Sequence, residues 1–352
     1  MSLPYRLSTE IPTSTQDYIN ARFDRYGVNL PQMRENFQSY IIASTVNEEP
    51  NAPPIRIFND VDAEATPPWE FHYTNEMFHS PDVPPPVRSK VYCDCEGKCG
   101  SNAKSKCACL KRQEEWTKAS GGDFKREKGF VYDAFGRVRF AYVPIFECND
   151  LCGCDEECRN RVVQHGRKVQ VNIRKTLKKG WGVFNGDNTI HSGTFIGIYS
   201  GELITDAEGE RRGQKYYKRT YLFDLDCYHL RPLVNRPGEP PKRLSREELQ
   251  RLDDEWTPKY TVDAFHAGNF TRFLNHSCDP NCNMTAVYIN EGNVDKPLLV
   301  VFSSREIYPG EELCFSYSGP VDESPQVKDG KETRLSDEIY MVCECGAFNC
   351  KG

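Results

Sequence analysis

Short apolar or alternating runs recur between Val169 and Tyr317, and Gly, Asn and Pro residues separate them. Runs of this length between such breakers are typical of β-strands. The predicted strands cover residues 170–173, 181–184, 194–199, 221–225, 260–262, 286–289, 298–302 and 313–316. The pattern therefore predicts a mainly β domain of many small strands, and the sequence holds no internal repeats.

The signals for helices are fewer, but their starts are clear. A helical pattern follows Ser14, and Gly27 marks its end. Thr205 and Ser245 each stand three residues before a glutamate, which is the capping-box spacing of a helix start. We therefore predict short helices that interrupt the strands.

Three stretches predict irregular structure. Residues 51–86 are rich in proline and predict an extended segment that wraps around the rest of the chain. Residues 231–258 combine prolines with a charged helix and predict a surface insertion. Residues 320–338 are polar and predict a linker.

The cysteines have metal-ligand spacing. Nine of the sixteen fall in two runs and three more stand near the C-terminus: Cys93, Cys95, Cys99, Cys107, Cys109; Cys148, Cys152, Cys154, Cys158; and Cys343, Cys345, Cys350. Thiolates so close in sequence can converge on one ion with little loss of loop entropy. Nine thiolates fill two tetrahedral sites with one left over, or three sites if three sulfurs each bridge two ions. The alternative, a disulfide framework of a secreted chain, is disfavoured because no signal peptide precedes the runs.

The residues between the two runs show little periodicity, so we expect metal to hold this segment together. The whole chain has 352 residues and 38% hydrophobic residues, enough for a genuine core. No apolar run is long enough to span a bilayer. The net charge of −6 favours a basic partner over nucleic acid. The many free thiols indicate a reducing compartment.

Residues 272–282 (RFLNHSCDPNC) and 310–317 (GEELCFSY) resemble the signature segments of the SET-domain lysine methyltransferases. Further matches follow in the order of the family: 179–184 (KGWGVF), 199–202 (YSGE), 221–226 (YLFDLD) and 260–264 (YTVDA). The two cysteine runs resemble its pre-SET module, and the last three cysteines resemble its post-SET module. The resemblance covers roughly residues 55 to 352 and is closest to histone H3 lysine-9 methyltransferases of the suppressor-of-variegation 3-9 type.

The resemblance implies a SET fold of small curved sheets with short helices and a threaded C-terminal segment. A triangular three-zinc, nine-cysteine pre-SET module and a single-zinc post-SET module would flank it. The implied domains are 1–90 (N-terminal helix and wrapping segment), 91–160 (pre-SET), 161–319 (SET, with the insertion 231–258), 320–338 (linker) and 339–352 (post-SET).

Three C-terminal cysteines are one short of a tetrahedral zinc site. The resemblance supplies Cys278 as the fourth ligand, which would hold the C-terminal tail over the active site. The three cysteines that remain, Cys227, Cys282 and Cys314, are expected to be small buried hydrophobes.

Methyl transfer from S-adenosylmethionine to an amine is an in-line displacement in a channel that excludes water. The resemblance gives catalytic roles to Tyr317, Tyr221, Phe315 and His276. The two tyrosines would line a channel for the substrate lysine, and whether Tyr317 acts as a base or only aligns the amine stays open. Phe315 would leave room for di- and trimethylated products.

The resemblance also implies a set of residues that bind S-adenosylmethionine. These are Lys179, Gly180, Trp181, Tyr221, Arg272, Phe273, Asn275, His276 and Tyr317. The Gly180-Trp181-Gly182 turn has neither the spacing nor the surroundings of a Rossmann fingerprint.

A histone H3 tail is expected to add as a strand to a sheet edge, while acidic residues read its basic side chains. The candidates are Asp224, Asp226, Asp253 and Asp254. These features imply a nuclear chromatin enzyme that methylates lysine 9 of histone H3, binds no membrane, and makes no sequence-specific contact with nucleic acid. The alternatives are a catalytically inactive SET scaffold and a zinc-cluster DNA-binding protein; the retained tyrosines disfavour the first, and the cysteine spacing and net acidity disfavour the second.

The sequence departs from the family pattern in two respects. Relatives continue past the last cysteine with an aromatic that packs on the cofactor, whereas this sequence ends two residues after Cys350, so we expect an incomplete cofactor pocket. Residues 1–50 lack the strand-like runs and aromatic cage of a chromodomain, so we expect a separate protein to direct the chain to chromatin.

Overall fold

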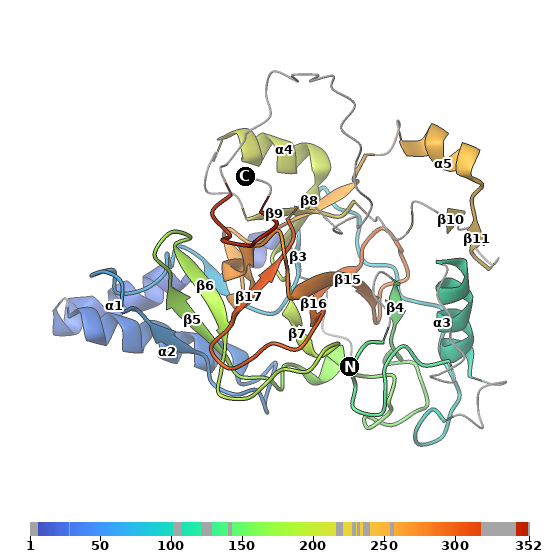
Figure 1. Cartoon of the computed structure of the whole chain (residues 1–352), viewed down its shortest axis with the longest axis horizontal. Helices are drawn as coiled ribbons and strands as arrows, with labels where there is room; N and C mark the ends of the chain where they lie inside the picture. Colours follow the sequence, from blue (N-terminus) through green and yellow to red (C-terminus); the bar gives the residue numbers. More distant parts are fainter. Residues whose placement is uncertain are drawn as a thin grey trace.

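Short strands from distant parts of the chain build the centre of the molecule, as the computed structural model shows (Figure 1). The structure describes residues 6–27, 29–100, 107–120, 129–139, 143–215, 221–226, 230, 233–234, 240–253, 257–317 and 343–350. The predicted linker 320–338 lies outside the described residues.

The α-helices are α1 (Thr15–Tyr26), α2 (Leu30–Thr45), α3 (Ala108–Ala119), α4 (Asp206–Lys215) and α5 (Arg246–Asp253). The 3-10 helices are η1 (Ser8–Glu10), η3 (Val163–His165) and η4 (Phe270–Phe273). The strands are β1 (Arg56–Phe58), β2 (His72–Tyr73), β3 (Phe78–His79), β4 (Ile145–Phe146), β5 (Val171–Lys175), β6 (Trp181–Asn185), β7 (Phe195–Ile198), β8 (Glu202–Thr205), β9 (Leu222–Asp224), β10 (Leu233–Val234), β11 (Lys242–Arg243), β12 (Tyr260–Asp263), β13 (Ala267–Gly268), β14 (Asn275–His276), β15 (Cys282–Tyr288), β16 (Leu298–Ser303) and β17 (Glu312–Phe315).

These strands form one five-stranded sheet (β1-β5-β6-β17-β14), two four-stranded sheets (β3-β8-β12-β9 and β4-β15-β16-β7) and two strand pairs (β10-β11 and β13-β2). Each of the eight predicted strand runs overlaps a strand, so the mainly β prediction is confirmed. None of the described helices is long and apolar enough to cross a membrane.

The N-terminal segment wraps around the sheets, as its proline content predicted. Its three short strands each join a sheet of the β domain: β1 pairs with β5, β2 with β13, and β3 with β8. α1 begins where the sequence indicates, because the Ser14 side chain accepts a hydrogen bond from the Asp17 amide at 3.2 Å. It ends at Gly27, which has a φ of +76°.

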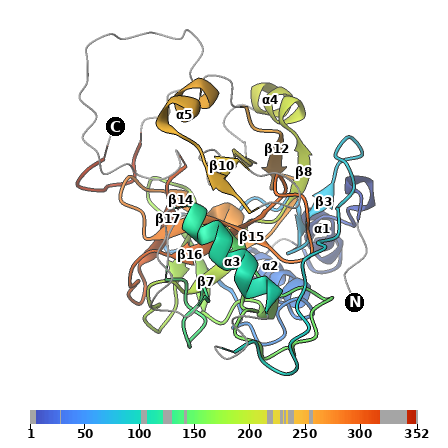
Figure 2. The same ribbon diagram turned by 90° about the vertical axis from the view of Figure 1, so that its right-hand side faces the viewer.

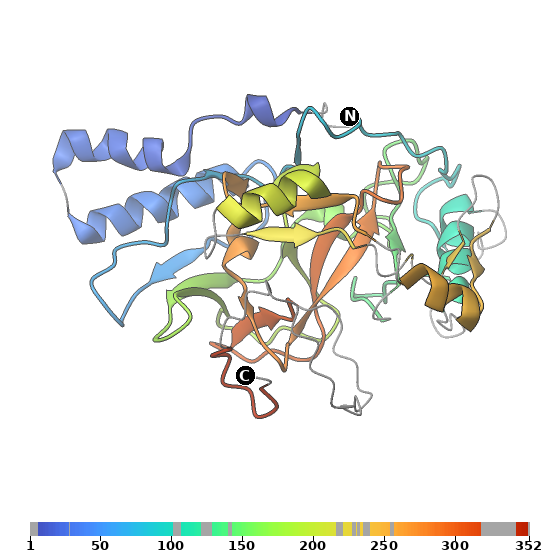
Figure 3. The same ribbon diagram turned by 90° about the horizontal axis from the view of Figure 1, so that it is seen from above.

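The prediction of a single N-terminal helix is wrong, because α2 follows α1. The α2 residues that are buried recur every fourth position: Met33, Phe37, Ile41 and Thr45. This spacing places them on one face, which packs against the β domain. Figures 1 and 3 show α1 and α2 side by side at one end of the molecule, with α3 and α5 at the other.

The segment between the two cysteine runs contains a helix, although its sequence shows little periodicity. α3 lies there and buries Leu110, Gln113 and Trp116. Trp116 contacts Phe146 of β4 with ring centroids 5.2 Å apart. Figure 2 shows α3 crossing the front of the molecule in that view.

The two helices predicted from capping signals are present. α5 in the insertion begins with a complete capping box, in which the Ser245 amide donates to Glu248 Oε2 at 2.9 Å and the Glu248 amide donates to Ser245 Oγ at 3.3 Å. α4 begins after Thr205, and its Glu208 carboxylate binds Arg211 and Arg212.

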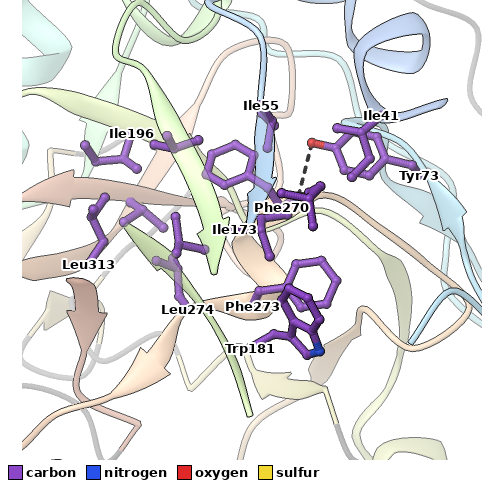
Figure 4. Close-up of a cluster of buried hydrophobic side chains, with 14 of the residues drawn as sticks. Ile41, Ile55, Tyr73, Ile173, Trp181, Ile196, Phe270, Phe273, Leu274 and Leu313 are labelled. Atoms are coloured by element: carbon purple, nitrogen blue, oxygen red, sulfur yellow. Dashed lines mark hydrogen bonds between the residues drawn. The ribbon is translucent and has the colours of Figure 1, made fainter. Parts of the chain in front are cut away.

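The main hydrophobic core joins the N-terminal segment to the strands that carry the predicted site. It contains Phe37 and Ile41 from α2 together with Trp181, Phe273 and Phe315. Figure 4 shows Trp181 and Phe273 lying together at one side of this cluster, and the Tyr73 hydroxyl accepts a hydrogen bond from the Phe270 amide at 3.2 Å.

Candidate functional site

The nine pre-SET cysteines form their own compact cluster, in which only Leu110 and Phe130 join them as buried members among the described residues. Pairs of sulfur atoms lie 3.5 to 3.8 Å apart, as for Cys93–Cys99 (3.6 Å) and Cys109–Cys152 (3.5 Å). Tetrahedral zinc with bonds of about 2.3 Å places its sulfurs about 3.8 Å apart. The cysteines therefore fit zinc, and sulfur takes the place of a hydrophobic core in this module.

The geometry distinguishes the two arrangements that the sequence left open. Three four-cysteine groups can each hold an ion, and Cys93 belongs to all three while Cys99 and Cys148 belong to two each. The Cys158 thiol in turn interacts with those of Cys99 and Cys148. If Cys158 takes the place of Cys93 in the group that contains Cys154, each shared sulfur bridges two ions, and the cluster matches three ions joined by three bridging thiolates. We assign the bridges to Cys93, Cys99 and Cys148.

The N–H groups around this cluster suit thiolate acceptors. Asn160 Nδ2 lies 3.5 Å from Cys148 Sγ, and Arg161 Nη2 lies 3.7 Å from Cys154 Sγ. Donors that surround a metal site orient its ligands and offset their negative charge.

The C-terminal cysteines come together with Cys278 as the resemblance implied. Cys278, Cys343, Cys345 and Cys350 form a group whose ligand atoms all lie within 4.8 Å of one another. The Cys278 and Cys343 sulfurs are 3.9 Å apart. This is a second zinc-type site, and it ties the last described residues to the end of β14. Of the other cysteines, Cys282 and Cys314 are buried as expected, and Cys227 lies outside the described residues.

The centre of the site is the place where β14 and β17 pair. These strands are parallel, with Asn275 beside Cys314 and His276 beside Phe315. The pairing brings the two signature segments into contact although about forty residues separate them. It places Tyr317, which follows β17, next to the paired segment.

A polar cluster of Lys179, Asn275 and Glu312 lies on the side of this strand pair that faces β6. Glu312 binds Lys179 through one carboxylate oxygen and accepts a hydrogen bond from Asn275 Nδ2 at 2.9 Å through the other. Asn275 Nδ2 also lies 3.3 Å from the Trp181 carbonyl oxygen. Glu312 lies in a signature segment, but no role is predicted for it from the sequence. In the structure Glu312 joins two residues predicted to bind the cofactor, Lys179 and Asn275.

The backbone of β6 approaches this polar cluster closely at Gly182. A Cβ atom there would lie 2.7 Å from Glu312 Oε1 and 2.9 Å from Asn275 Nδ2. Gly180, in the same turn, has a φ of +68°, which glycine adopts readily. The structure therefore explains why glycine occupies both positions, independently of the resemblance.

His276 links the C-terminal cysteine site to Tyr317. Its Nδ1 accepts a hydrogen bond from the Tyr317 amide at 3.1 Å, and its Nε2 lies 3.5 Å from Cys278 Sγ. Because Nδ1 is the acceptor, a neutral ring carries its proton on Nε2, which faces the sulfur.

Tyr317 has an open ring and an enclosed hydroxyl. The residue is 58% exposed, but its hydroxyl donates to the Leu274 carbonyl at 2.7 Å. Desolvation of this hydroxyl raises the pKa of Tyr317 above its usual value near 10. The phenol therefore stays protonated at neutral pH.

A row of aromatic rings continues inward from Tyr317. Ring centroids are 4.9 Å apart for Tyr317 and Phe315, 5.9 Å for Phe315 and Phe223, and 5.7 Å for Phe223 and Tyr199. Phe315 is 4% exposed, so the row is anchored in the main core. Tyr221, two residues before Phe223, is half-buried, and its ring centroid lies 6.2 Å from that of Phe265.

Arg272 lies beneath this aromatic row. Its guanidinium lies 3.8 Å from the Tyr221 ring centroid, and its Nε donates to the Ala264 carbonyl at 2.8 Å. Its Nη1 and the Trp181 Nε1 are buried without a hydrogen-bond partner among the described residues. Unpaired buried donors of this kind are unusual and suit a site that takes a polar ligand.

The side chains of two of the four acidic residues proposed to bind the basic side chains of the substrate can be placed in the structure. Asp224 ends β9, which is the edge strand of its sheet, and accepts a hydrogen bond from the Thr261 hydroxyl at 2.8 Å. Asp226 follows two residues later and is partly buried. The side chain of Asp253 and all of Asp254 lie outside the described part of the chain.

Comparison with known proteins yields two family models. The Pre-SET motif matches residues 47–161, and the SET domain matches residues 180–318. A curated relative from Cryptococcus neoformans var. grubii, described as a histone-lysine N-methyltransferase, H3 lysine-9 specific, is 40% identical over 363 residues. The alignment covers 91% of this chain but 20% of that relative, so the chain spans a fifth of its length.

Solved structures give the same picture. The Neurospora SET domain protein DIM-5, a histone lysine methyltransferase, is 28% identical with a TM-score of 0.57, covering 78% of this chain and 98% of that one. A structure of KRYPTONITE in complex with mCHH DNA, H3(1-15) peptide and SAH is 27% identical with a TM-score of 0.59, covering 84% of this chain and 50% of that one. The SET fold expected from the signature segments is thus confirmed.

Proposed function

The chain belongs to the family in which a Pre-SET motif precedes a SET domain, and from this premise we propose that it is an S-adenosylmethionine-dependent protein-lysine methyltransferase. Its substrate is the side chain of lysine 9 in histone H3, and its products are the di- and trimethylated lysine. The relative from Cryptococcus supports this substrate, since it carries that specificity in its description. The observation that carries the proposal is the pairing of β14 with β17, which places a polar cluster next to a row of aromatic rings.

The polar cluster supports binding of the methyl donor. S-adenosylmethionine supplies a methyl group on a positively charged sulfur, and its amino-acid end carries one charge of each sign. Lys179 and Glu312 offer the two opposite charges side by side. The unpaired donors of Trp181 and Arg272 offer further hydrogen bonds. These residues fit the donor, together with Gly180, Tyr221, Phe273, Asn275, His276 and Tyr317.

The aromatic row supports binding of the lysine. The amine must be neutral to attack, and deprotonating a lysine with a pKa near 10.4 at neutral pH costs roughly 4 kcal/mol. Aromatic walls lower this cost because they exclude water and disfavour the charged amine. Tyr221 and Tyr317 then orient the nitrogen.

Tyr317 acts as an aligning group in this proposal. Its pKa is raised by desolvation and its proton is donated to the Leu274 carbonyl, so the hydroxyl oxygen is free to accept from the amine but not to take its proton at neutral pH. The lysine ammonium loses one proton to water before transfer; the nitrogen lone pair then forms the new N–C bond while the C–S bond breaks and its electron pair stays on sulfur.

The edge strand β9 supports binding of an extended peptide. A histone tail paired with this edge would run past Asp224 and Asp226, whose carboxylates suit its arginines and lysines. The KRYPTONITE complex contains an H3(1-15) peptide, which supports a histone tail as the partner. The location is then the nucleus, and a separate protein directs the chain to chromatin.

A methyl-transfer assay tests the proposal. The chain is incubated with labelled S-adenosylmethionine and an H3 tail peptide, with lysine 9 intact or replaced by arginine. We expect label only in the intact peptide, and a Tyr317→Phe variant should lose at least tenfold in rate. Equal labelling of both peptides contradicts the lysine-9 assignment. No labelling of any peptide by a folded, zinc-loaded chain means an inactive scaffold.

A further inference from the structure

The guanidinium of Arg272 lies between two aromatic rings, and one of them comes from the N-terminal segment. It lies 3.8 Å from the ring centroid of Tyr221 and 4.0 Å from that of Phe71. Arg272 is 6% exposed and its Nε is held by the Ala264 carbonyl. A planar cation stacked in this way orients the ring beside it.

The orientation of the Tyr221 ring depends on this stack. The Tyr221 carbonyl accepts hydrogen bonds from the Tyr199 hydroxyl at 2.9 Å and the Ala264 amide at 3.1 Å. These bonds fix the main chain but not the side-chain torsions. The ring is half-buried, so its direction is set by packing, and the guanidinium covers one of its faces.

Phe71 connects the stack to the N-terminal helices. It is 1% exposed, and its carbonyl accepts a hydrogen bond from the Thr15 amide at 2.5 Å, in the first turn of α1. It belongs to the same core as Ile19 of α1 and Phe37 of α2. The main chain of Phe71 is therefore bonded to the first turn of α1, and its ring lies in the core to which α1 and α2 contribute.

We propose that Phe71 is a positioning residue for methyl transfer: it presses the Arg272 guanidinium against Tyr221, so that the N-terminal helices help set the shape of the lysine channel. The inference rests on the proposed function. It gives residues 8–71 a role in the reaction itself rather than in stability alone.

The test compares two substitutions in the same core. Phe71→Leu removes the ring that faces Arg272, whereas Phe37→Leu removes a ring of equal size that is equally buried in α2. Both variants are expected to lose similar thermal stability. If Phe71→Leu does not fold, Phe71→Met keeps more of the side-chain volume and takes its place.

Two readouts separate positioning from stability. In steady-state kinetics, Phe71→Leu should lower kcat about tenfold with the KM for S-adenosylmethionine within about threefold, while Phe37→Leu changes neither beyond twofold. In a chain labelled with 3-fluorotyrosine, the 19F resonance of Tyr221, assigned through Tyr221→Phe, should shift or broaden in Phe71→Leu and stay in place in Phe37→Leu. The second readout needs no turnover.

A double substitution shows whether the effect passes through Arg272. If it does, Phe71→Leu should add less than twofold to the kcat loss of Arg272→Lys, because the stack is already broken. Full additivity, or equal kcat and an unmoved Tyr221 resonance in the two leucine variants, overturns the inference. If the wild-type chain transfers no methyl group, the proposed function fails, and the 19F comparison still decides whether Phe71 fixes Tyr221.

Discussion

Gly182→Ala tests the polar cluster of the proposed cofactor site with the smallest possible change. The added Cβ would lie 2.7 Å from Glu312 Oε1 and 2.9 Å from Asn275 Nδ2, both too close for an ordinary contact. The two atoms are tips of side chains and can move aside, so the β6 backbone can keep its place. We therefore expect the fold to survive and the cluster to break.

The size of the effect follows from what the two tips lose. The Asn275–Glu312 hydrogen bond of 2.9 Å must lengthen, and the Glu312 carboxylate must turn relative to Lys179. A hydrogen bond to a charged group contributes about 1.5–3 kcal/mol. If S-adenosylmethionine binds only to the intact cluster, restoring it against the added Cβ costs about this much and should weaken binding roughly 10- to 150-fold, at about 1.4 kcal/mol for each factor of ten.

Isothermal titration with S-adenosylmethionine measures this affinity, and thermal unfolding measures the fold. Gly213→Ala is the matched control, because its Cβ in α4 would meet Leu222 Cδ1 at 3.5 Å, an ordinary contact. The control should bind as the wild type does and gain up to about 1 kcal/mol of stability from helix propensity. A Gly182→Ala chain that binds S-adenosylmethionine within twofold of wild type would refute the role given to the polar cluster.

Four further outcomes are expected. Phe315→Tyr places a hydroxyl beside the aromatic row and should shift the main product to monomethyl-lysine; an unchanged mass-spectrometric distribution contradicts the role of Phe315. The methylation rate should rise from pH 7 towards pH 10, because the substrate lysine loses its proton while the raised pKa keeps Tyr317 protonated; a flat profile on folded protein argues against this. Burial raises the pKa of Glu48 to about 7, so the folded chain keeps a proton that the unfolded chain releases, and the free energy of unfolding should fall by up to about 3 kcal/mol between pH 5 and pH 8. Glu48→Gln, which can still accept from the Asn75 amide, should flatten that fall in denaturant titrations, and an equal slope in both proteins contradicts it. Chelation should release about four zinc ions per chain, one for each four-cysteine group, and abolish activity; a fully active metal-free chain would overturn the cysteine assignment.

Local sequence signals predicted the features whose causes are local. The strand runs, the Ser14 cap and the Ser245 capping box depend on neighbours within a few residues, and the structure confirms each of them. α2 escaped prediction because apolar residues such as Leu30 and Ile42 lie outside its buried face and weaken the helical pattern. α3 escaped because its buried face includes Cys109 and Gln113, which are not read as apolar.

The residues of the candidate site also differ in whether neighbours in the sequence or distant residues determine their role. The cysteines of the two runs are recognisable as zinc ligands from their spacing, but which of them share an ion is not, because Cys107 and Cys109 fall in different four-cysteine groups. Phe71 could not be found this way, because its partner Arg272 lies some two hundred residues later and only the packing of the N-terminal segment brings them together. Glu312 stands in a signature segment, yet its role appears only when β17 is placed beside β6.

His276 contacts both the C-terminal cysteine site and Tyr317 of the proposed lysine channel, so metal binding at the first can affect the second. His276 faces Cys278 through Nε2 and holds the Tyr317 amide through Nδ1. A zinc-bound thiolate is a good acceptor, so metal at Cys278 favours the proton on Nε2 and leaves Nδ1 free to accept. Metal held by Cys278 would therefore do more than anchor the tail. It would favour the tautomer that holds the backbone of Tyr317, and so it would connect metal binding to the position of the residue proposed to align the amine.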